Sequence, residues 1–206
     1  MRVALVGGTG AFGVALATRL LAAGHEPVIG SRDAERAASI AADLGCEGAA
    51  NEDAVRSAEL VVLATKADGA VEAARSLREA IGTTPVLSVA AELRFTKEGV
   101  LPTPEPTSIA ERIQAVLDAP VVAGLHSLAA SNLGGAEPPD EDALICGDDP
   151  AAKALVLELA SSLTAGRALD AGPLAGARAL EGMTAVIVNL NKRYKAHAGL
   201  RVTGIP

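Results

Sequence analysis

Residues 1–13 read MRVALVGGTGAFG, a short apolar run followed by a glycine-rich turn. The run at Arg2–Val6 has the length and continuous hydrophobicity of a buried β-strand. After the turn, apolar positions recur at helical spacing on one face as far as Leu21. A strand, a glycine-rich turn and an amphipathic helix in this order predict the first unit of a dinucleotide-binding α/β fold.

The turn carries its glycines at the spacing G-x-G-x-x-G, as Gly8, Gly10 and Gly13. In this motif the first two glycines permit a tight turn and a close approach of backbone to a pyrophosphate, and the third lets the helix pack on the strand. The N–H groups at the start of the helix then face the phosphates. The pattern predicts a nucleotide site, and a merely structural turn is the alternative.

A second stretch, GSRDAER at residues 30–36, selects the dinucleotide. Proteins that bind NAD usually place an acid at the end of the second strand, where it binds the ribose 2′-hydroxyl. Here Ser31 and Arg32 stand at that position, with Arg36 one helical turn later, and these groups suit a 2′-phosphate. Asp33 is the competing acid, although it also suits the start of the next helix. We therefore expect NADP(H).

Further strands and helices alternate along the chain, which predicts a doubly wound parallel sheet of the Rossmann type with helices on both faces. Strands are expected near residues 27–29, 57–65, 84–91, 120–126, 143–146 and 167–169, and helices near 34–44, 71–81, 109–117, 150–163 and 174–194. The Pro-rich residues 98–107 are expected to form a loop. The acidic stretch GGAEPPDED at 134–142 is the candidate boundary. The division is residues 1–138, an NADP-binding Rossmann domain, and residues 139–206, a small α-rich domain that covers the cleft.

Composition and charge restrict the partners. The net charge of −7 and the pI of about 5.0 argue against nucleic-acid binding. No stretch approaches the roughly 18 consecutive apolar residues of a membrane span. Cys46 and Cys146 lack a CxxC partner, which is typical of reduced thiols in a cytosolic protein. We expect a cytoplasmic protein whose small-molecule cofactors are its main partners.

The last expected helix is apolar nearly all round. Leu180, Met183, Ile187 and Leu190 share one stripe, and Val186 makes another side apolar too. A helix of this kind is buried on more than one side. In a small terminal domain the second covering surface could be another subunit, so we expect a homodimer that uses this helix.

Several segments together resemble the NADPH-dependent reductases of the deazaflavin coenzyme F420. They are VALVGGTGAFG at 3–13, AGHEPVIGSR at 23–32, LHS at 125–127, CGDD at 146–149, LDAGPL at 169–174 and LNKRYKAHAGLRVTG at 190–204. The resemblance covers nearly the whole chain. It implies a Rossmann domain and a small C-terminal domain, with NADPH and F420 in the cleft between them and direct hydride transfer from one ring to the other.

The resemblance also assigns residues. NADP would be held by Gly8, Thr9, Gly10, Ala11, Phe12, Ser31, Arg32 and Arg36, and later cofactor contacts would fall on Ala67, Ala91 and Ala130. The chain departs from the family pattern in three loops that border the cleft. They read ATKADGA at 64–70 where many relatives carry Pro-Trp, SVAAEL at 88–93, and SLAASNL at 127–133.

Direct hydride transfer requires alignment of the two rings more than acid–base help, so no catalytic base is assigned. His126, at the end of an expected strand near the ligand-binding edge, is a candidate substrate contact, and Ser127 is its neighbour. A hydrogen-bonded structural histidine is the alternative for His126. The three histidines share no metal-ligand spacing, so no metal is expected.

The C-terminal residues carry Lys192, Arg193, Lys195 and Arg201 and no acid after Glu181. These cations either complement the end of the last helix or meet an anionic ligand such as the tail of F420. Two other functions remain open from the sequence. One is an NADP-dependent reductase of another small acceptor, in which Lys192 donates a proton, and the other is a noncatalytic NADP-binding sensor.

Overall fold

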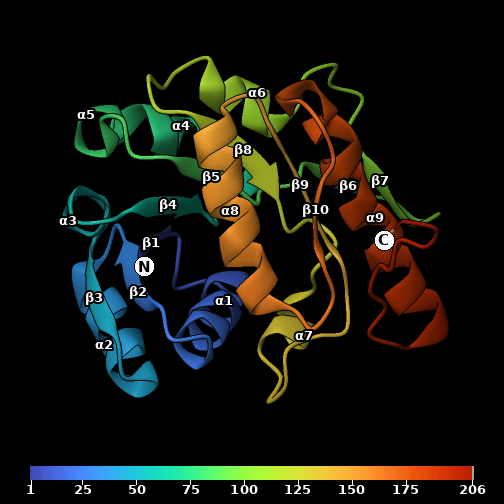
Figure 1. The fold of residues 1–206 in the computed structure, drawn as a ribbon, viewed down its shortest axis with the longest axis horizontal. Coiled ribbons are helices and arrows are strands. Elements are labelled where there is room, and N and C mark those ends of the chain that lie inside the picture. The colour runs from blue at the N-terminus through green and yellow to red at the C-terminus, as the bar shows by residue number, and fades with distance from the viewer. Residues whose placement is uncertain (206) are drawn as a thin grey trace.

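The computed structural model describes residues 1–205. Figure 1 shows a sheet with helices on both sides. The strands are β1 Arg2–Val6, β2 Glu26–Ser31, β3 Glu47–Ala50, β4 Leu60–Leu63, β5 Val86–Ser88, β6 Leu93–Phe95, β7 Val100–Pro102, β8 Val121–Gly124, β9 Ala143–Gly147 and β10 Ala168–Asp170. The helices are α1 Ala11–Ala22, α2 Ala34–Leu44, α3 Asn51–Arg56, α4 Ala67–Ser76, α5 Arg78–Ile81, α6 Ile109–Gln114, α7 Ala130–Leu133, α8 Pro150–Leu163 and α9 Ala177–Tyr194, with a 3₁₀ turn at Leu174–Gly176.

The main sheet has eight strands in the order β10-β9-β8-β5-β4-β1-β2-β3. The chain builds β1, β2 and β3 outward on one side of β1, and then returns to place β4 on the other side. This reversal next to β1 is the topological switch point of a Rossmann fold, and ligands bind outside the carboxyl ends of the strands there. The predicted fold class is confirmed.

Each face of the sheet has its own core. Successive residues of a strand point to opposite faces, so Ala4 and Val6 belong to one cluster and Val3 and Leu5 to the other. Helices α4, α6 and α9 contribute to the first cluster, whereas α1, α2 and α8 contribute to the second. Burial on both faces explains why the central strands are continuous apolar runs.

The two strands at one edge, β9 and β10, run against the other six strands of the main sheet. The neighbours in the sheet are parallel except β8 and β9, which pair antiparallel with Ala123 opposite Cys146. The expected parallel sheet is therefore mostly parallel, with two reversed strands at this edge. The sheet also continues across residue 138, because β9 and β10 lie in it. The division into residues 1–138 and 139–206 stays a prediction about folding units.

Residues 93–102 form a hairpin that the sequence did not indicate. Strands β6 and β7 pair antiparallel, with Arg94 opposite Leu101, inside a segment whose second half was expected to be a loop. The side-chain amide of Asn189 on α9 accepts from the N–H of Val100 at 2.8 Å and donates to its carbonyl at 2.7 Å. Hydrogen bonds from a helix 89 residues later thus complete the edge of this short hairpin, which lies beside α9 (Figure 1).

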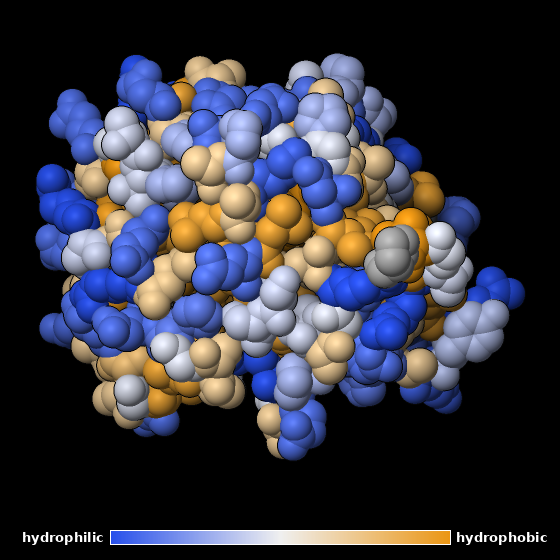
Figure 2. Space-filling model, in the orientation of Figure 1, coloured by the Kyte–Doolittle hydropathy of each residue, from blue (hydrophilic) through white to orange (hydrophobic). Residues whose placement is uncertain are grey.

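Helix α9 is buried on one side only. Leu180, Ala185 and Ile187 are buried, whereas Val186 is 55% exposed and Leu190 is 38% exposed. A groove of about 770 Å³ follows this outer face, between Pro102, α9 and the C-terminal residues near Leu200. Figure 2 shows hydrophobic side chains in an interrupted band across the middle of one face of the molecule. In residues 1–205, no helix is both long and apolar enough to cross a membrane.

Candidate dinucleotide site

The glycine-rich turn connects β1 to α1. Gly7 has φ +80, and the N–H of Gly8 donates to the carbonyls of Leu5 and Gly30 at 2.9 and 3.1 Å. These bonds fold the turn back over the ends of β1 and β2. Helix α1 begins after Gly10 with no side chain capping it. Its first N–H groups are therefore available to an anion, which is the arrangement that binds phosphates in such folds.

The fold requires glycine at two of the three motif positions, and the third position points to a ligand. A Cβ on Gly13 would lie 2.6 Å from Gly8 Cα, and a Cβ on Gly8 would lie 2.7 Å from Leu5 O. Packing alone requires those two glycines. Gly10 has an ordinary φ of −81°, and a Cβ there would meet nothing closer than Gly7 O at 3.5 Å. Neither backbone strain nor packing requires glycine at this position, so the open space above it fits a closely approaching ligand.

The residues after β2 leave two cations unpaired. Asp33 caps α2 by accepting from the N–H of Arg36 at 3.0 Å, and Ser31 Oγ accepts from the N–H of Asp33 at 3.1 Å. Arg32 and Arg36 are exposed, and within residues 1–205 neither guanidinium has an ion pair or hydrogen bond. In a chain of net charge −7, this pair is a local basic site that suits a phosphate.

Within residues 1–205, four of the eight buried side-chain polar atoms that lack a partner lie at the same edge of the sheet. Asn51 Oδ1, Thr65 Oγ1, Ser88 Oγ and His126 Nδ1 have no hydrogen-bond partner within the described residues. Each lies at or just after the carboxyl end of β3, β4, β5 or β8. Such atoms cost free energy unless a ligand or water satisfies them. Ala67, Ala91 and Ala130 follow β4, β5 and β8, so the fold brings them to this edge too.

His126 is held in the interior at this edge. Leu125 before it has a left-handed backbone with φ 63, and His126 itself is only 7% exposed. Its Nε2 lies 3.2 Å from the carbonyl of Ala90, which can only accept, so Nε2 carries the proton. Thr184 of α9 donates to the His126 carbonyl at 3.0 Å. Burial lowers the pKa of His126 to about 4, so the side chain is neutral at pH 7.

Ser127 has a different environment. Its hydroxyl is buried and donates to the carbonyl of Asp142 at 3.3 Å, next to the start of β9. The bond joins the end of β8 to the antiparallel strand. A role for Ser127 in substrate binding stays a prediction, as does the role of His126.

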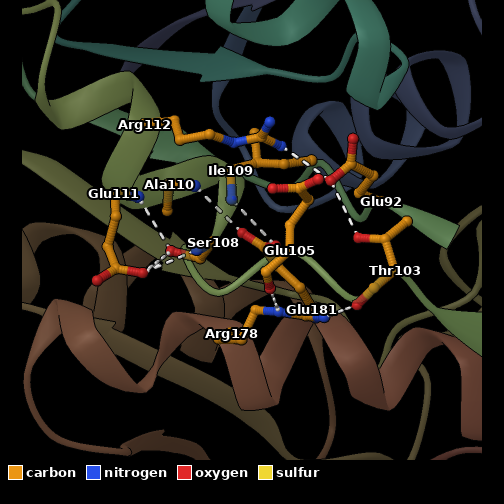
Figure 3. Close-up of polar contacts among 10 residues, drawn as sticks. All are labelled: Glu92, Thr103, Glu105, Ser108, Ile109, Ala110, Glu111, Arg112, Arg178 and Glu181. Atoms are coloured by element: carbon orange, nitrogen blue, oxygen red, sulfur yellow. Dashed lines mark hydrogen bonds and ion pairs between the residues drawn. The ribbon is translucent and has the colours of Figure 1, made fainter.

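A buried glutamate joins α9 to α6. Glu181, 2% exposed, accepts from the N–H groups of Ile109 and Ala110 at 3.1 Å each (Figure 3). Ser108 and Glu111 complete the helix start with a capping box. Burial raises the pKa of Glu181, and the two N–H groups oppose that rise. The sequence offered one signal for this contact, an acid on the apolar stripe of the last helix.

Arginines hold the chain that leads into α6. Arg178 of α9 donates to the carbonyl of Glu105 at 2.9 Å and also to that of Thr103. Arg112 forms an ion pair with Glu92 at 3.0 Å, and Glu92 accepts from the Thr103 hydroxyl at 3.1 Å (Figure 3). Because Glu92 follows Ala91 directly, these bonds restrain the turn after β5 from the side of α6.

The basic C-terminal residues are partly engaged. The ammonium of Lys192 lies 5.1 Å from the ring centroid of Phe95 on β6, and Arg201 pairs with Asp140 at 2.5 Å. Arg193 borders the outer face of α9. The described residues contain no group of three His, Cys, Asp or Glu side chains placed to hold a metal ion.

The strand order, the uncapped helix start and the cation pair define a dinucleotide-binding protein of the Rossmann class. A family model described as NADP oxidoreductase, coenzyme F420-dependent, matches residues 2–92. The F420-dependent NADP reductase of Methanothermobacter thermautotrophicus is 34% identical over all of this chain and 96% of its own length. That of Methanocaldococcus jannaschii is 34% identical over all of this chain and 99% of its own.

The structure agrees with these sequence matches. The crystal structure of a protein from Arthrobacter sp. FB24, described as an F420-dependent NADP reductase by similarity, superposes on this chain with a TM-score of 0.87 and 27% identity. The match covers 99% of this chain and 100% of that one. The chain therefore belongs to the F420-dependent NADP reductase family.

Proposed function

We propose that this protein is an oxidoreductase that transfers a hydride between NADP(H) and the deazaflavin coenzyme F420. Relatives named for this activity match the whole chain at about 34% identity, and the chain carries the glycine motif and the cations expected of an NADP site. The single observation that carries the NADP half is the pair of unpaired guanidiniums, Arg32 and Arg36, with Asp33, the acid that follows Arg32, already used as the cap of α2. A free carboxylate at this place would favour NAD instead.

The chain's own residues bind the two cofactors and align their rings. We assign the pyrophosphate to the backbone of Gly8–Phe12 with Thr9 beside it, and the 2′-phosphate to Ser31, Arg32 and Arg36. Ala67, Ala91 and Ala130 border the rings with small side chains, and His126 and Ser127 stand on the acceptor side. When bound, the nicotinamide and deazaflavin rings supply the hydride chemistry themselves, so the protein contributes position and electrostatics.

The same proposal includes a homodimer in the cytoplasm. The exposed apolar side chains of Val186 and Leu190, with the groove beside them, are a surface that a second copy of α9 would cover. Reduced, partly or fully buried cysteines agree with a reducing compartment.

An absorbance assay tests the function directly. Protein, NADPH and oxidised F420 are mixed and the deazaflavin absorbance is followed, and the assay is repeated with NADH. We expect bleaching with NADPH and much slower bleaching with NADH. No bleaching with either cofactor would refute F420 reduction and leave two alternatives, a reductase of another acceptor or an NADP-binding sensor. The NADPH affinity, measured by titration, would then distinguish a protein that binds NADPH from one that is simply inactive.

A further inference from the structure

Arg19 is a buried cation whose partners are all backbone carbonyls. It lies in the last turn of α1 and is 4% exposed. Its Nε donates to the carbonyl of Leu133 at 3.1 Å, and its Nη2 donates to those of Gly135 and Glu137 at 2.5 and 2.8 Å. No carboxylate of the described chain forms an ion pair with it.

Burying a guanidinium without a carboxylate is costly unless several hydrogen bonds compensate. Leu133 is the last residue of α7, and a cation is favourable at the C-terminus of a helix. The planar guanidinium can serve three carbonyls on an irregular segment at once, which lysine cannot do in the same geometry. The bonds therefore hold residues 133–137 against α1.

Helix α7 packs directly on α1. A Cβ on Gly134, which ends α7, would lie 3.5 Å from Ala15 Cβ and 3.3 Å from Ala130 O. Phe12 at the start of α1 and Ala130 at the start of α7 pack against the same hydrophobic cluster. Side chains on a helix lean toward its N-terminus, so Arg19 reaches back from the last turn of α1 to the carbonyls at the end of α7 and just after it.

The two helices joined in this way border the two halves of the proposed site. Helix α1 starts at the pyrophosphate turn, and α7 follows directly on His126 and Ser127 at the carboxyl end of β8. We propose that Arg19 is a positioning residue for hydride transfer, which sets the place of residues 126–137 relative to the NADP-binding helix. This inference rests on the proposed function. Hydride transfer is sensitive to placement, and a shift of about 1 Å can cost about 100-fold in rate.

The test compares Arg19→Met and Arg19→Lys with Arg2→Met. Arg2 is also hydrogen-bonded, to Ser57 and Glu47, but it stands at the amino end of β1, away from the site. We expect Arg19→Met to lower kcat for F420 reduction about 10- to 100-fold, with the Kd for NADPH changed less than about 3-fold. The kinetic isotope effect with NADPH deuterated at the transferred position should rise, and Arg19→Lys should fall between wild type and Arg19→Met. Arg2→Met should change none of these quantities.

A readout without cofactors accompanies the assay. Hydrogen exchange of the ligand-free Arg19→Met protein should be faster in residues 126–137 and unchanged in β1 and β2. Wild-type kcat in Arg19→Met, or a parallel loss of NADPH affinity and kcat, would overturn the proposal. An inactive wild-type protein would instead refute the proposed function.

A second variant covers the case in which Arg19→Met does not fold. Gly134→Ala leaves the charge in place and puts a Cβ 3.3 Å from Ala130 O, so the single turn of α7 must shift by a few tenths of an ångström. The same fall in kcat at constant NADPH affinity is expected. A folded Gly134→Ala protein with wild-type kcat and isotope effect would contradict the proposal.

Discussion

Asp33 Oδ1 accepts the backbone N–H of Arg36 at 3.0 Å, so the acid nearest to Ser31 and Arg32 is engaged as the cap of α2. The same bond orients the first turn of the helix that carries the Arg36 guanidinium. Residues 30–36 contain two acids, Asp33 and Glu35, and two cations, and this bond engages the acid that follows Ser31 and Arg32 directly.

This arrangement predicts the cofactor preference. The double variant Arg32→Ala, Arg36→Ala should raise the Kd for NADPH at least about 10-fold and leave that for NADH nearly unchanged, because charge-assisted bonds contribute about 1.5–3 kcal/mol each. Fluorescence titration with both cofactors measures it. Arg56→Ala, which removes an exposed cation paired with Glu52, is the control. Equal losses for NADPH and NADH would contradict the assignment of the 2′-phosphate site.

Two glycines of one motif should respond differently to alanine. Gly13→Ala places a Cβ 2.6 Å from Gly8 Cα and should lower the free energy of unfolding by about 1–3 kcal/mol. Gly10→Ala creates no such clash, so it should change the free energy of unfolding by less than about 1 kcal/mol. It should nevertheless weaken NADPH binding. Urea unfolding and NADPH titration of both variants separate the effects. A stable Gly10→Ala protein with wild-type affinity would show that no ligand approaches this position.

His126 should make the protein less stable in mild acid. Its pKa in the fold, about 4, lies below the value of 6.5 for an unperturbed histidine, so the unfolded chain binds the proton more readily. The contribution is fully present above pH 6.5 and is lost as the pH falls toward 4. Between pH 7 and pH 5 the loss is about 2 kcal/mol.

Unfolding in urea at both pH values measures this loss. His126→Gln cannot titrate in this range, so the fall in its free energy of unfolding between pH 7 and pH 5 should be smaller than that of wild type by about the same amount. Identical falls in wild type and variant would mean that His126 is not buried neutral.

The outer face of α9 should govern assembly. Val186→Asp combined with Leu190→Asp places two charges on the exposed apolar stripe and should convert a dimer into a monomer. Sedimentation velocity at micromolar concentration gives the mass. Ala154→Asp, at an exposed position of α8, adds a charge elsewhere and should leave the mass unchanged. A wild-type protein that sediments as a monomer would refute the dimer.

The first strand, the turn and the helix after it could be predicted from the sequence because their signals are local. The hydrophobic periodicity, the glycine spacing and residues 31–36 all belong to one βαβ unit. Each of these signals depends only on residues that are close together in the sequence. The helix at 150–163 was predicted with its observed bounds for the same reason, since Asp149 and Pro150 mark its start.

The remaining features depend on partners far along the chain. The direction of β9, the hairpin that Asn189 completes and the cap that Glu181 lends to α6 each join segments that no local period connects. Arg19, an ordinary helical arginine in the sequence, becomes a buried cation because residues 133–137 fold over it. The sequence by itself determined which dinucleotide the chain is suited to bind. Tertiary contacts alone decided which charged side chains are buried and which backbone groups they bind. The reason is that burial depends on the segments that pack around a side chain.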